Sequence, residues 1–313
     1  MNARTKIGAV CLTYNSAGDL ADCLDGLFAQ VGLDLWIIVV DNASSPEERA
    51  RMEAIFSARA WDGKVLDAAD GTPETIGETR ALFLRNGVNA GYSAGNNIGA
   101  RTAVALGCTA VLVVNPDVRI EEPGVVAGLA AALSSAPDIA VAAPAVVSLA
   151  GADENPSTEL SFTEEVLAPL RLVLSGLRLW PRRGPASITG DAVERVSGAC
   201  FLVRAGFLEE IGFFDEGVFL YCEESILAAQ VRDRKKRIVY RPELRVLHAH
   251  DTSRKGDPVR RFAAWARSRA YYHRTYTRYG PLRRAALRGA QALTLALVKT
   301  YQTMERRKNG GAR

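Results

Sequence analysis

Several absences narrow the class of protein before any motif is considered. The five cysteines are odd in number and never occur as CxxC, which argues against a zinc site and against a disulfide framework. The simplest compartment for such a chain is the reducing cytoplasm. The chain begins MNARTKIGAVCLTYN, without the apolar core and cleavage site of a secretory leader, and no apolar run approaches the roughly 20 residues that a membrane-spanning helix needs. We therefore expect a protein that is soluble or attached to a membrane surface.

Two common nucleotide-binding motifs are also absent. No GxGxxG follows the first strand-like run, and no glycine-rich loop ends in GK[ST], so nicotinamide-dependent and kinase-like functions lose their best evidence. Instead, Gly91, Gly95 and Gly99 recur every four residues. On a helix they would form a stripe without side chains that lets a strand or a ligand approach closely. Helix packing alone would explain the same spacing.

The pattern of apolar residues predicts an α/β fold. At 313 residues and 48% hydrophobic content the chain can bury a full core, and we expect one catalytic unit with an appendage. A helical pattern at 18–30 would place Leu20, Leu24, Leu27 and Phe28 on one face. Strand-like runs alternate with such segments, which favours a mostly parallel sheet covered by helices on both faces. These runs are 6–14, 35–41, 110–115 and 139–147.

Polar residues follow three of these runs directly. Asn15, Asp41 and Asp117 should share one edge of the sheet, because ligands of α/β sheets bind beyond the carboxyl ends of the strands. Asp117, in VLVVNPDVRI, suits a helix cap, a loop hydrogen-bonder or a metal ligand. Asp41, in IIVVDNASS, suits those roles or a hydrogen bond to a base or ribose.

The second half of the chain is less regular. Residues 150–190 indicate a loop with a short amphipathic helix, either a lid or lipid-facing element or an ordinary surface excursion. The segment KRIVYRPELRVLHAHDTS, 236–253, resembles a strand pair that ends in two histidines. From Pro258 onward we expect two helices broken at YGP, forming a helical C-terminal extension over 258–313.

Charge is concentrated in that extension. Between Arg254 and Arg313 lie 16 of the 39 Lys and Arg residues but only 2 of the 35 Asp and Glu residues. Apolar residues lie among these arginines, which is typical of a helix on an anionic membrane surface. A helix packed on the core and a helix that pairs with a second subunit as a homodimer are the alternatives. We expect no nucleic-acid partner, because no recognition motif is present and the body of the chain is acidic.

Seven motifs occur in an order that identifies a family. CLTYN, VVDNAS, NAGYSAGNNIGA, VVNPDV, SGACFLVRAGFLEEIGFFDE, FLYCEE and VLHAHDTS follow one another as in family 2 glycosyltransferases, and the chain especially resembles their rhamnosyltransferase-like branch. The resemblance covers roughly residues 7–280 and implies a nucleotide-diphospho-sugar transferase domain of GT-A fold. It implies a glycosyltransferase domain over 1–257, with a nucleotide-sugar-binding half at 1–150 and an acceptor and catalytic half at 190–257.

The resemblance also assigns the donor site. Its residues would be of two kinds, those that hold the base and ribose and those that line the nucleotide-sugar cleft. The first kind is Thr13, Tyr14, Asn15 and Asp41, and the second is Asn89, Gly91 and Asn97.

A metal site is implied at the DxD-like position, where Asn115, Pro116 and Asp117 stand. There Asp117 would bind a divalent cation that bridges the diphosphate, and the late histidine of the family matches His248. His250 and Asp251 remain alternatives or partners. Departure of a diphosphate develops negative charge, so Mg²⁺ or Mn²⁺ must neutralise it, and a carboxylate with an imidazole suits Mn²⁺ better.

Arginines of the segment WARSRAYY are further candidates for phosphate contacts. Arg267 and Arg269 would add charge-assisted hydrogen bonds to phosphate oxygens. The alternative for both is a solvated helix face.

Inversion requires a base on the far side of the sugar. The family uses the aspartate of a Glu-Asp pair, and FLYCEE places Glu224 at that position with Glu223 before it. The motif also departs from the family at three later positions, Ser225, Ile226 and Gln230. The alternative is that both glutamates simply open a helix and favour its dipole.

These residues together predict an inverting glycosyltransferase. By resemblance, the donor is dTDP-rhamnose first and a UDP-sugar second, and the acceptor is a glycan or lipid-linked saccharide of cell-surface polysaccharide or cell-wall assembly. Such an enzyme would be cytoplasmic, with peripheral attachment to the inner face of the membrane. The altered Glu-Asp motif leaves a second hypothesis, a non-catalytic relative that binds nucleotide sugars or a glycolipid as an assembly partner.

Overall fold

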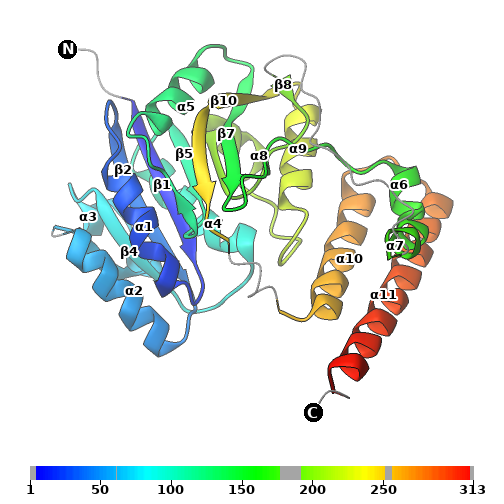
Figure 1. Ribbon diagram of the computed structural model, residues 1–313. Coiled ribbons are helices and arrows are strands. Elements are labelled where there is room, and N and C mark those ends of the chain that lie inside the picture. Colours follow the sequence, from blue (N-terminus) through cyan, green and yellow to red (C-terminus); the bar gives the residue numbers. More distant parts are fainter. Residues whose placement is uncertain (1–4, 61, 177–191, 251–255, 311–313) are drawn as a thin grey trace.

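The computed structural model describes residues 5–60, 62–176, 192–250 and 256–310, with side chains described as far as residue 304. At its centre lies a ten-stranded sheet of order β3-β4-β2-β1-β5-β9-β7-β10-β6, with β8 paired to β10 (Figure 1). The strands are β1 Lys6–Thr13, β2 Asp34–Asn42, β3 Lys64–Asp67, β4 Ala81–Asn86, β5 Ala110–Val114, β6 Val118–Arg119, β7 Ile139–Ser148, β8 Ala192–Val193, β9 Cys200–Arg204 and β10 Arg237–His248.

The first half of the sheet is parallel, as the apolar runs predict. Strand β1 pairs with β2 and β5, and β2 and β3 both pair with β4, all in parallel. Strand β9 then lies antiparallel between β5 and β7, and β6 lies antiparallel to β10. All four predicted strands are confirmed, and the sheet is mostly parallel.

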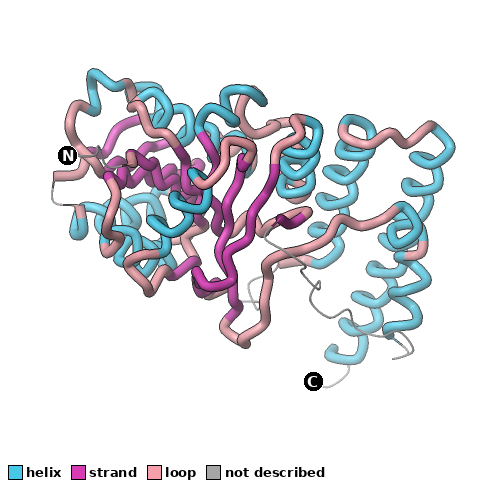
Figure 2. Tube along the Cα trace, turned by 90° about the horizontal axis from the view of Figure 1, so that it is seen from above, coloured by secondary structure: helices cyan, strands magenta, loops and turns pink. Residues whose placement is uncertain are grey.

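Helices cover both faces of the sheet (Figure 2). Along β1, Cys11 joins a hydrophobic cluster with one set of helices, whereas its neighbour Val10 joins the cluster on the other face. This alternation follows from the two-residue period of a strand. The first set is α1 Ala17–Phe28, α2 Pro46–Arg59 and α5 Val125–Ser134, and the second is α4 Tyr92–Ala105, α8 Ala205–Ile211 and α9 Glu223–Asp233. The short helices η1 Ala68–Asp70 and α3 Pro73–Ile76 complete this part.

Two local expectations are wrong. Phe28, the last residue of α1, is 41% exposed, whereas Leu20, Leu24 and Leu27 are buried. The segment with the two histidines contributes one long strand, β10, where a strand pair was expected. Its pairing with β7 jumps from Arg241 to Arg245, so the residues around Pro242 bulge instead of turning, since proline has no N–H to donate to the sheet.

Four helices form a group beside the sheet (Figure 1). The helices α6 Phe162–Val166 and α7 Ala168–Gly176 pack on α11 Pro281–Gly310, which also packs on α10 Pro258–Thr275. The two predicted C-terminal helices and the helix within 150–190 are confirmed, although residues 177–191 of that segment lie outside the described ones. The domain boundary at 257 stays a prediction, because α6 and α7, which precede it in the sequence, pack on the C-terminal helix α11. Among the described helices, none is both long and apolar enough to cross a membrane.

Candidate active site

The carboxyl ends of β1, β2 and β5 border a cleft of about 500 Å³. The register places Thr13 beside Asp41 and Cys11 beside Val114, so these strands end at one edge, as predicted. The start of α4 and the loop before α9 close the cleft from the other side. Six of the predicted site residues line it: Thr13, Tyr14, Asn89, Gly91, Asn115 and Asp117.

Asp41 and Asn15 support this cleft without lining it. The carboxylate of Asp41 is fully buried and accepts hydrogen bonds from the Ser44 N–H at 3.1 Å and from Arg49 Nε at 2.6 Å. Asn15 has a positive φ of 51°, and its Oδ1 accepts a hydrogen bond from the Ser45 N–H at 2.9 Å. Both side chains therefore fix the loop after β2, and a donor contact from either stays a prediction.

An asparagine that sequence reasoning missed organises the same edge. The amide of Asn42 donates to Asn89 Oδ1 at 3.0 Å and to the Gly91 carbonyl at 3.2 Å, and its oxygen accepts from Asn86 Nδ2 at 2.9 Å. Asn42 also lines the cleft. Its only signal in the sequence is its place directly after Asp41 in VVDNAS.

The glycine stripe lets two segments approach α4. At Gly95 and Gly99 an added Cβ would lie 2.4 Å from Leu12 and 2.5 Å from Val10, so β1 itself fills the stripe. At Gly91, with φ of 107°, the Cβ would lie 2.3 Å from the Phe219 carbonyl oxygen, which accepts the Tyr92 N–H at 2.9 Å. The predicted close approach is thus confirmed, and at Gly91 it fixes the loop that borders the cleft.

Asn97 lies away from the cleft. Its amide donates to the Phe214 carbonyl at 2.8 Å and to Glu216 at 2.7 Å, and its oxygen accepts the Phe214 N–H at 2.9 Å. The side chain is buried and all of these bonds are internal. It therefore holds the segment after α8 on α4, and the sequence interpretation of Asn97 as a cleft residue finds no geometric support.

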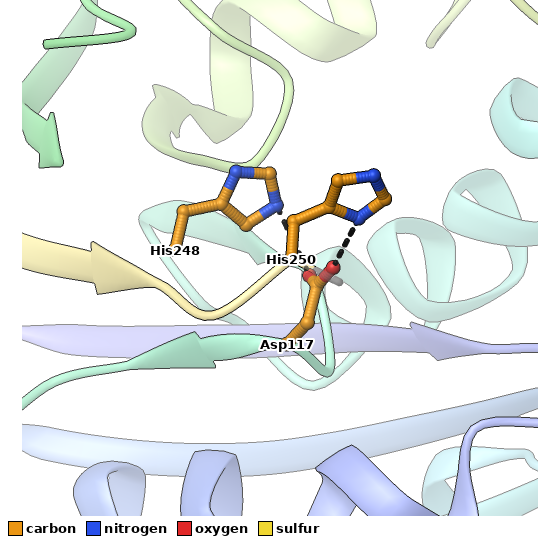
Figure 3. A group of neighbouring side chains, drawn as sticks. All are labelled: Asp117, His248 and His250. Carbon is orange, nitrogen blue, oxygen red and sulfur yellow. Dashed lines mark hydrogen bonds and ion pairs between the residues drawn. The ribbon is translucent and has the colours of Figure 1, made fainter. Parts of the chain in front are cut away.

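Asp117, His248 and His250 converge where the sheet meets the cleft (Figure 3). Asp117 Oδ1 lies 3.3 Å from His248 Nε2, and Asp117 Oδ2 lies 3.3 Å from His250 Nδ1. The pairing of β6 with β10 brings them together, since Val118 faces His248 and the Ala249 N–H donates to the Asp117 carbonyl at 2.8 Å. Asp251 lies outside the described residues.

The chemistry of this cluster fits a divalent cation. One carboxylate and two imidazoles offer ligand atoms within 4.8 Å of one another, a donor set suited to Mn²⁺. Asp117 Oδ1 and His248 Nε2 are both buried, and neither has a hydrogen bond within the described residues. Glu154 contacts the other ring nitrogen, Nδ1, of His248 at 2.6 Å, which is the usual support for a metal-binding imidazole.

The charges of the cluster are strongly coupled. Burial disfavours the charged form of His248, but Asp117 and Glu154 outweigh this effect and raise the pKa of the imidazole to about 9. Burial also opposes ionisation of Asp117, yet His248 and then His250 lower the pKa of its carboxyl. A proton therefore occupies the cluster readily when no cation does, and a cation would have to displace it.

A second cleft, of about 390 Å³, adjoins the first. Tyr92, Asn115 and Leu220 line both clefts, and His248 borders the second while Asp117 borders the first. The aromatic ring of Trp265 also lines the second cleft. The cluster of Asp117, His248 and His250 therefore lies where the two clefts meet.

The two predicted catalytic glutamates lie in this second cleft. They occupy the first turn of α9, directly after two residues with φ of 71°, Tyr221 and Cys222. Burial raises the pKa of Glu223 to about 8, the Glu224 carboxylate adds to the shift, and Glu223 Oε1 is buried without a hydrogen bond among the described residues. Glu224 Oε1 accepts the Gly198 N–H at 3.4 Å. The glutamates do open a helix, and they also face a cavity.

The two predicted phosphate-binding arginines differ in environment. Arg269 is 2% exposed and binds Glu165 and Glu159, each at 2.5 Å, so a solvated helix face is the wrong interpretation for it. Burial disfavours its charged form, but Glu165 and Glu159 outweigh this and raise the pKa of the guanidinium. Arg267 is exposed and lines neither cleft.

A small polar network around Arg269 was missed from the sequence. Arg269 and Arg195 both donate to Ser225 Oγ, at 3.4 Å and 3.0 Å, and both line the second cleft. Ser225 stands directly after Glu224, so this network fixes the start of α9 from the side of the cavity. Only the fold brings these residues together, because 30 to 44 positions separate Ser225 from its two partners.

Solved structures with the same fold support the class. Mannosyltransferase PcManGT from Pyrobaculum calidifontis, in complex with GDP-Man and Mn²⁺, has a TM-score of 0.55 at 16% identity and covers 97% of this chain and 76% of its own. GalNAc-T7 with UDP, GalNAc and Mn²⁺ has a TM-score of 0.59 at 13% identity, over 93% of this chain and 55% of its own. S. aureus TarS 1–349 has a TM-score of 0.52 at 13% identity, over 92% and 70%. The fold is that of a GT-A glycosyltransferase.

Curated relatives narrow the class to a family. The N-acetylglucosaminyl-diphospho-decaprenol L-rhamnosyltransferase of Mycobacterium tuberculosis is 30% identical over 231 residues, which cover 64% of this chain and 70% of that protein. The low-salt glycan biosynthesis hexosyltransferase Agl10 of Haloferax volcanii is 22% identical over 219 residues, 70% of this chain and 59% of that protein's length. No protein-family model matches the chain. The chain belongs to the family 2 glycosyltransferases, in their rhamnosyltransferase-like branch.

Proposed function

We propose that the protein is a metal-dependent, inverting glycosyltransferase that transfers L-rhamnose from dTDP-rhamnose, or a hexose from a UDP-sugar, to a glycan or lipid-linked acceptor. The observation that carries the proposal is the position of the Asp117 and histidine cluster between two adjoining clefts. The similarity to the mycobacterial N-acetylglucosaminyl-diphospho-decaprenol L-rhamnosyltransferase supports the sugar and a lipid-linked acceptor. Mn²⁺ in two of the similar structures supports the cation.

In this proposal the donor lies in the cleft at the strand ends. The exposed ring of Tyr14 is available to the base, and Asn89 and Gly91 border the path of the sugar. Asp117, His248 and His250 would hold Mn²⁺ or Mg²⁺, and the bound cation would neutralise the charge that develops on the leaving diphosphate. Glu154 keeps the Nε2 atom of His248 directed at Asp117 by binding its Nδ1 atom.

The acceptor then lies in the second cleft, against α9. Inversion needs a base that takes the acceptor hydroxyl's proton on the side of the sugar opposite the diphosphate. Glu223, with a pKa of about 8, is mostly protonated at pH 7 and cannot take a second proton. Glu224 is therefore the base in this proposal, held toward Gly198, and Glu223 is its neutral neighbour. Arg269 keeps the start of α9 in place and leaves phosphate binding to other groups.

The C-terminal helix offers a way to meet a lipid-linked acceptor. One face of α11 is buried through Leu287, Ala290 and Thr294, while Leu282 is 86% and Leu293 54% exposed. We propose that the exposed apolar side chains and the nearby arginines attach the protein peripherally to the cytoplasmic face of an anionic membrane. A second subunit on the same face, giving a homodimer, is the competing arrangement.

A transfer assay tests the proposed reaction. Purified protein would be incubated with Mn²⁺, dTDP-rhamnose or a UDP-sugar, and a lipid-linked N-acetylglucosaminyl diphosphate, and the product identified by mass spectrometry. We expect a mass gain of one deoxyhexose or hexose that the Glu224→Gln variant does not produce. Tight donor binding with no product from any acceptor would instead support a non-catalytic relative.

A further inference from the structure

A separate basic hollow lies between the two C-terminal helices. Its volume is about 280 Å³, and it shares no lining residue with either cleft of the candidate active site. The turn between α10 and α11 brings the end of one helix beside the start of the other, which is where the hollow forms (Figure 1). Its lining residues are Ala270, His273, Arg274, Pro281, Arg284 and Arg288.

Three arginines line this hollow. Arg274 comes from the last turn of α10, and Arg284 and Arg288, four positions apart, lie on one face of α11. Within the described part of the chain, no carboxylate lines the hollow and none of these three arginines has an ion pair. Arg274 lies over the ring of Tyr271 at 5.4 Å, a contact that leaves its charge uncompensated. Like charges held together without a carboxylate repel one another, so an anion that enters the hollow is stabilised by all three.

The carboxylate nearest to the buried side of the hollow, Glu165, does not neutralise the three arginines. His273 is buried there, and its Nε2 contacts Glu165 at 3.0 Å. The same carboxylate binds Arg269 at 2.5 Å, so its charge is already compensated. Pro281, the first residue of the 30-residue helix α11, also lines the hollow, and the N-terminal end of a helix favours an anion.

We propose that this hollow binds a phosphate group, either a terminal monophosphate or a diphosphate. The oxygens of a tetrahedral, multiply charged phosphate can accept hydrogen bonds from several guanidinium groups at once. A single carboxylate has two oxygens and would be bound by one guanidinium group. The group is carried by a soluble phosphorylated molecule or by a lipid headgroup, and both present the same oxygens to the arginines.

Calorimetry with inorganic pyrophosphate tests the site on the full chain. Excess chelator keeps metal out of the Asp117 cluster, so the donor cleft cannot bind the probe through a cation. The double variant Arg284→Gln/Arg288→Gln should bind pyrophosphate about tenfold more weakly, since it loses two charged contacts that are partly screened by solvent. The single variant Arg288→Gln should show a smaller loss, and it serves if the double variant does not fold.

A matched control distinguishes binding in the hollow from nonspecific attraction of the anion by the basic surface. Arg260→Gln/Lys299→Gln also removes two positive charges, but from exposed positions of α10 and α11 outside the hollow. This variant should bind pyrophosphate like the unmodified protein. Equal weakening in both double variants, or no binding by the unmodified protein, overturns the proposal.

Vesicles then identify the carrier of the phosphate. They contain phosphatidylcholine with phosphatidic acid, whose headgroup is a phosphate monoester. Displacement of the protein from them by pyrophosphate supports a headgroup ligand, whereas pyrophosphate binding without vesicle binding supports a soluble one.

Discussion

His248 Nε2 lies 3.3 Å from Asp117 Oδ1, and both atoms are buried (Figure 3). Without a cation this contact is that of an imidazole with a carboxylate, and we propose that both atoms bind a shared cation when one is present, because this donor set suits Mn²⁺. The pair lies where the two clefts meet, because Asp117 borders one cleft and His248 the other.

Removal of either ligand should abolish metal-supported turnover. We expect Asp117→Asn and His248→Ala to weaken Mn²⁺ binding and to slow donor turnover by about 10²–10³-fold, the usual cost of losing one group that stabilises developing charge. Calorimetry with Mn²⁺ and a steady-state assay measure the two effects. The exposed Asp62 provides a control, since Asp62→Asn should change neither. A normal rate in Asp117→Asn would remove the metal role.

The two glutamates of α9 should differ in their effect on transfer. Glu224→Gln should keep the fold and donor affinity but lose about 10²–10⁴-fold in transfer rate, because an amide cannot accept the proton. Glu223→Gln should lose much less, since a group with a pKa of about 8 is already neutral at pH 7. Single-turnover rates measure both. Equal losses would mean that the base is assigned to the wrong carboxylate.

The raised pKa of Glu223 predicts a pH-dependent stability. Between the ordinary pKa of glutamate and about 8, the folded protein holds a proton on Glu223 that the unfolded chain releases. This contribution to stability is complete at low pH and is lost as the pH rises through about 8, with a size on the order of a few kcal/mol. Urea unfolding of the unmodified protein and of Glu223→Gln at pH 5 to 8 measures it. We expect the unmodified protein to lose stability relative to the variant as pH rises, and parallel curves would contradict the shift.

The contact between Gly91 and the Phe219 carbonyl should control the shape of the cleft. A Cβ at Gly91 would lie 2.3 Å from that oxygen, so Gly91→Ala must displace the loop before α9, at a cost of about 2 kcal/mol or more. Gly107→Ala is a matched control, because Gly107 has a φ of 81° and no neighbour within 4 Å. We expect both variants to melt earlier, but only Gly91→Ala to bind the donor more weakly. Equal donor affinities would show that the loop does not shape the cleft.

Attachment to a membrane should depend on the exposed face of α11. Leu282→Gln/Leu293→Gln changes two exposed side chains and leaves the packed face intact, so it should keep the fold but sediment less with anionic vesicles. The unmodified protein should bind phosphatidylglycerol vesicles at low salt, ignore neutral ones and dissociate as salt rises. Failure of the unmodified protein to bind anionic vesicles would contradict membrane attachment and favour a homodimer formed through this face of α11.

The sheet and its carboxyl edge were predictable because buried parallel strands are continuous apolar runs. The strand pair expected within 236–253 is wrong, because pairing with β7 on both sides of an irregularity between Arg241 and Arg245 keeps this segment in one strand, β10. The prediction also failed for Phe28, because periodicity predicts a face of the helix but not where the helix ends.

Site residues were predictable only where a motif marked them. Motifs placed Asp117, Glu223 and Glu224 beside cavities but could not show which way Asn97 points on α4. Nothing local to Arg269 indicates that it is buried, because its partner Glu165 is 104 residues away and only the fold brings α10 beside α6.

Metal-dependent stabilisation by a nucleotide sugar tests the central claim most directly. The melting temperature would be measured for the unmodified protein and Asp117→Asn with dTDP-rhamnose, UDP-sugars and GDP-mannose, each with Mn²⁺ and with excess chelator. A ligand at a hundred times its Kd stabilises the native state by about 2.7 kcal/mol. We predict a clear rise for at least one donor in Mn²⁺ that disappears in chelator and in Asp117→Asn. Equal stabilisation with and without metal, or none by any donor, would contradict a cation-supported donor site at Asp117.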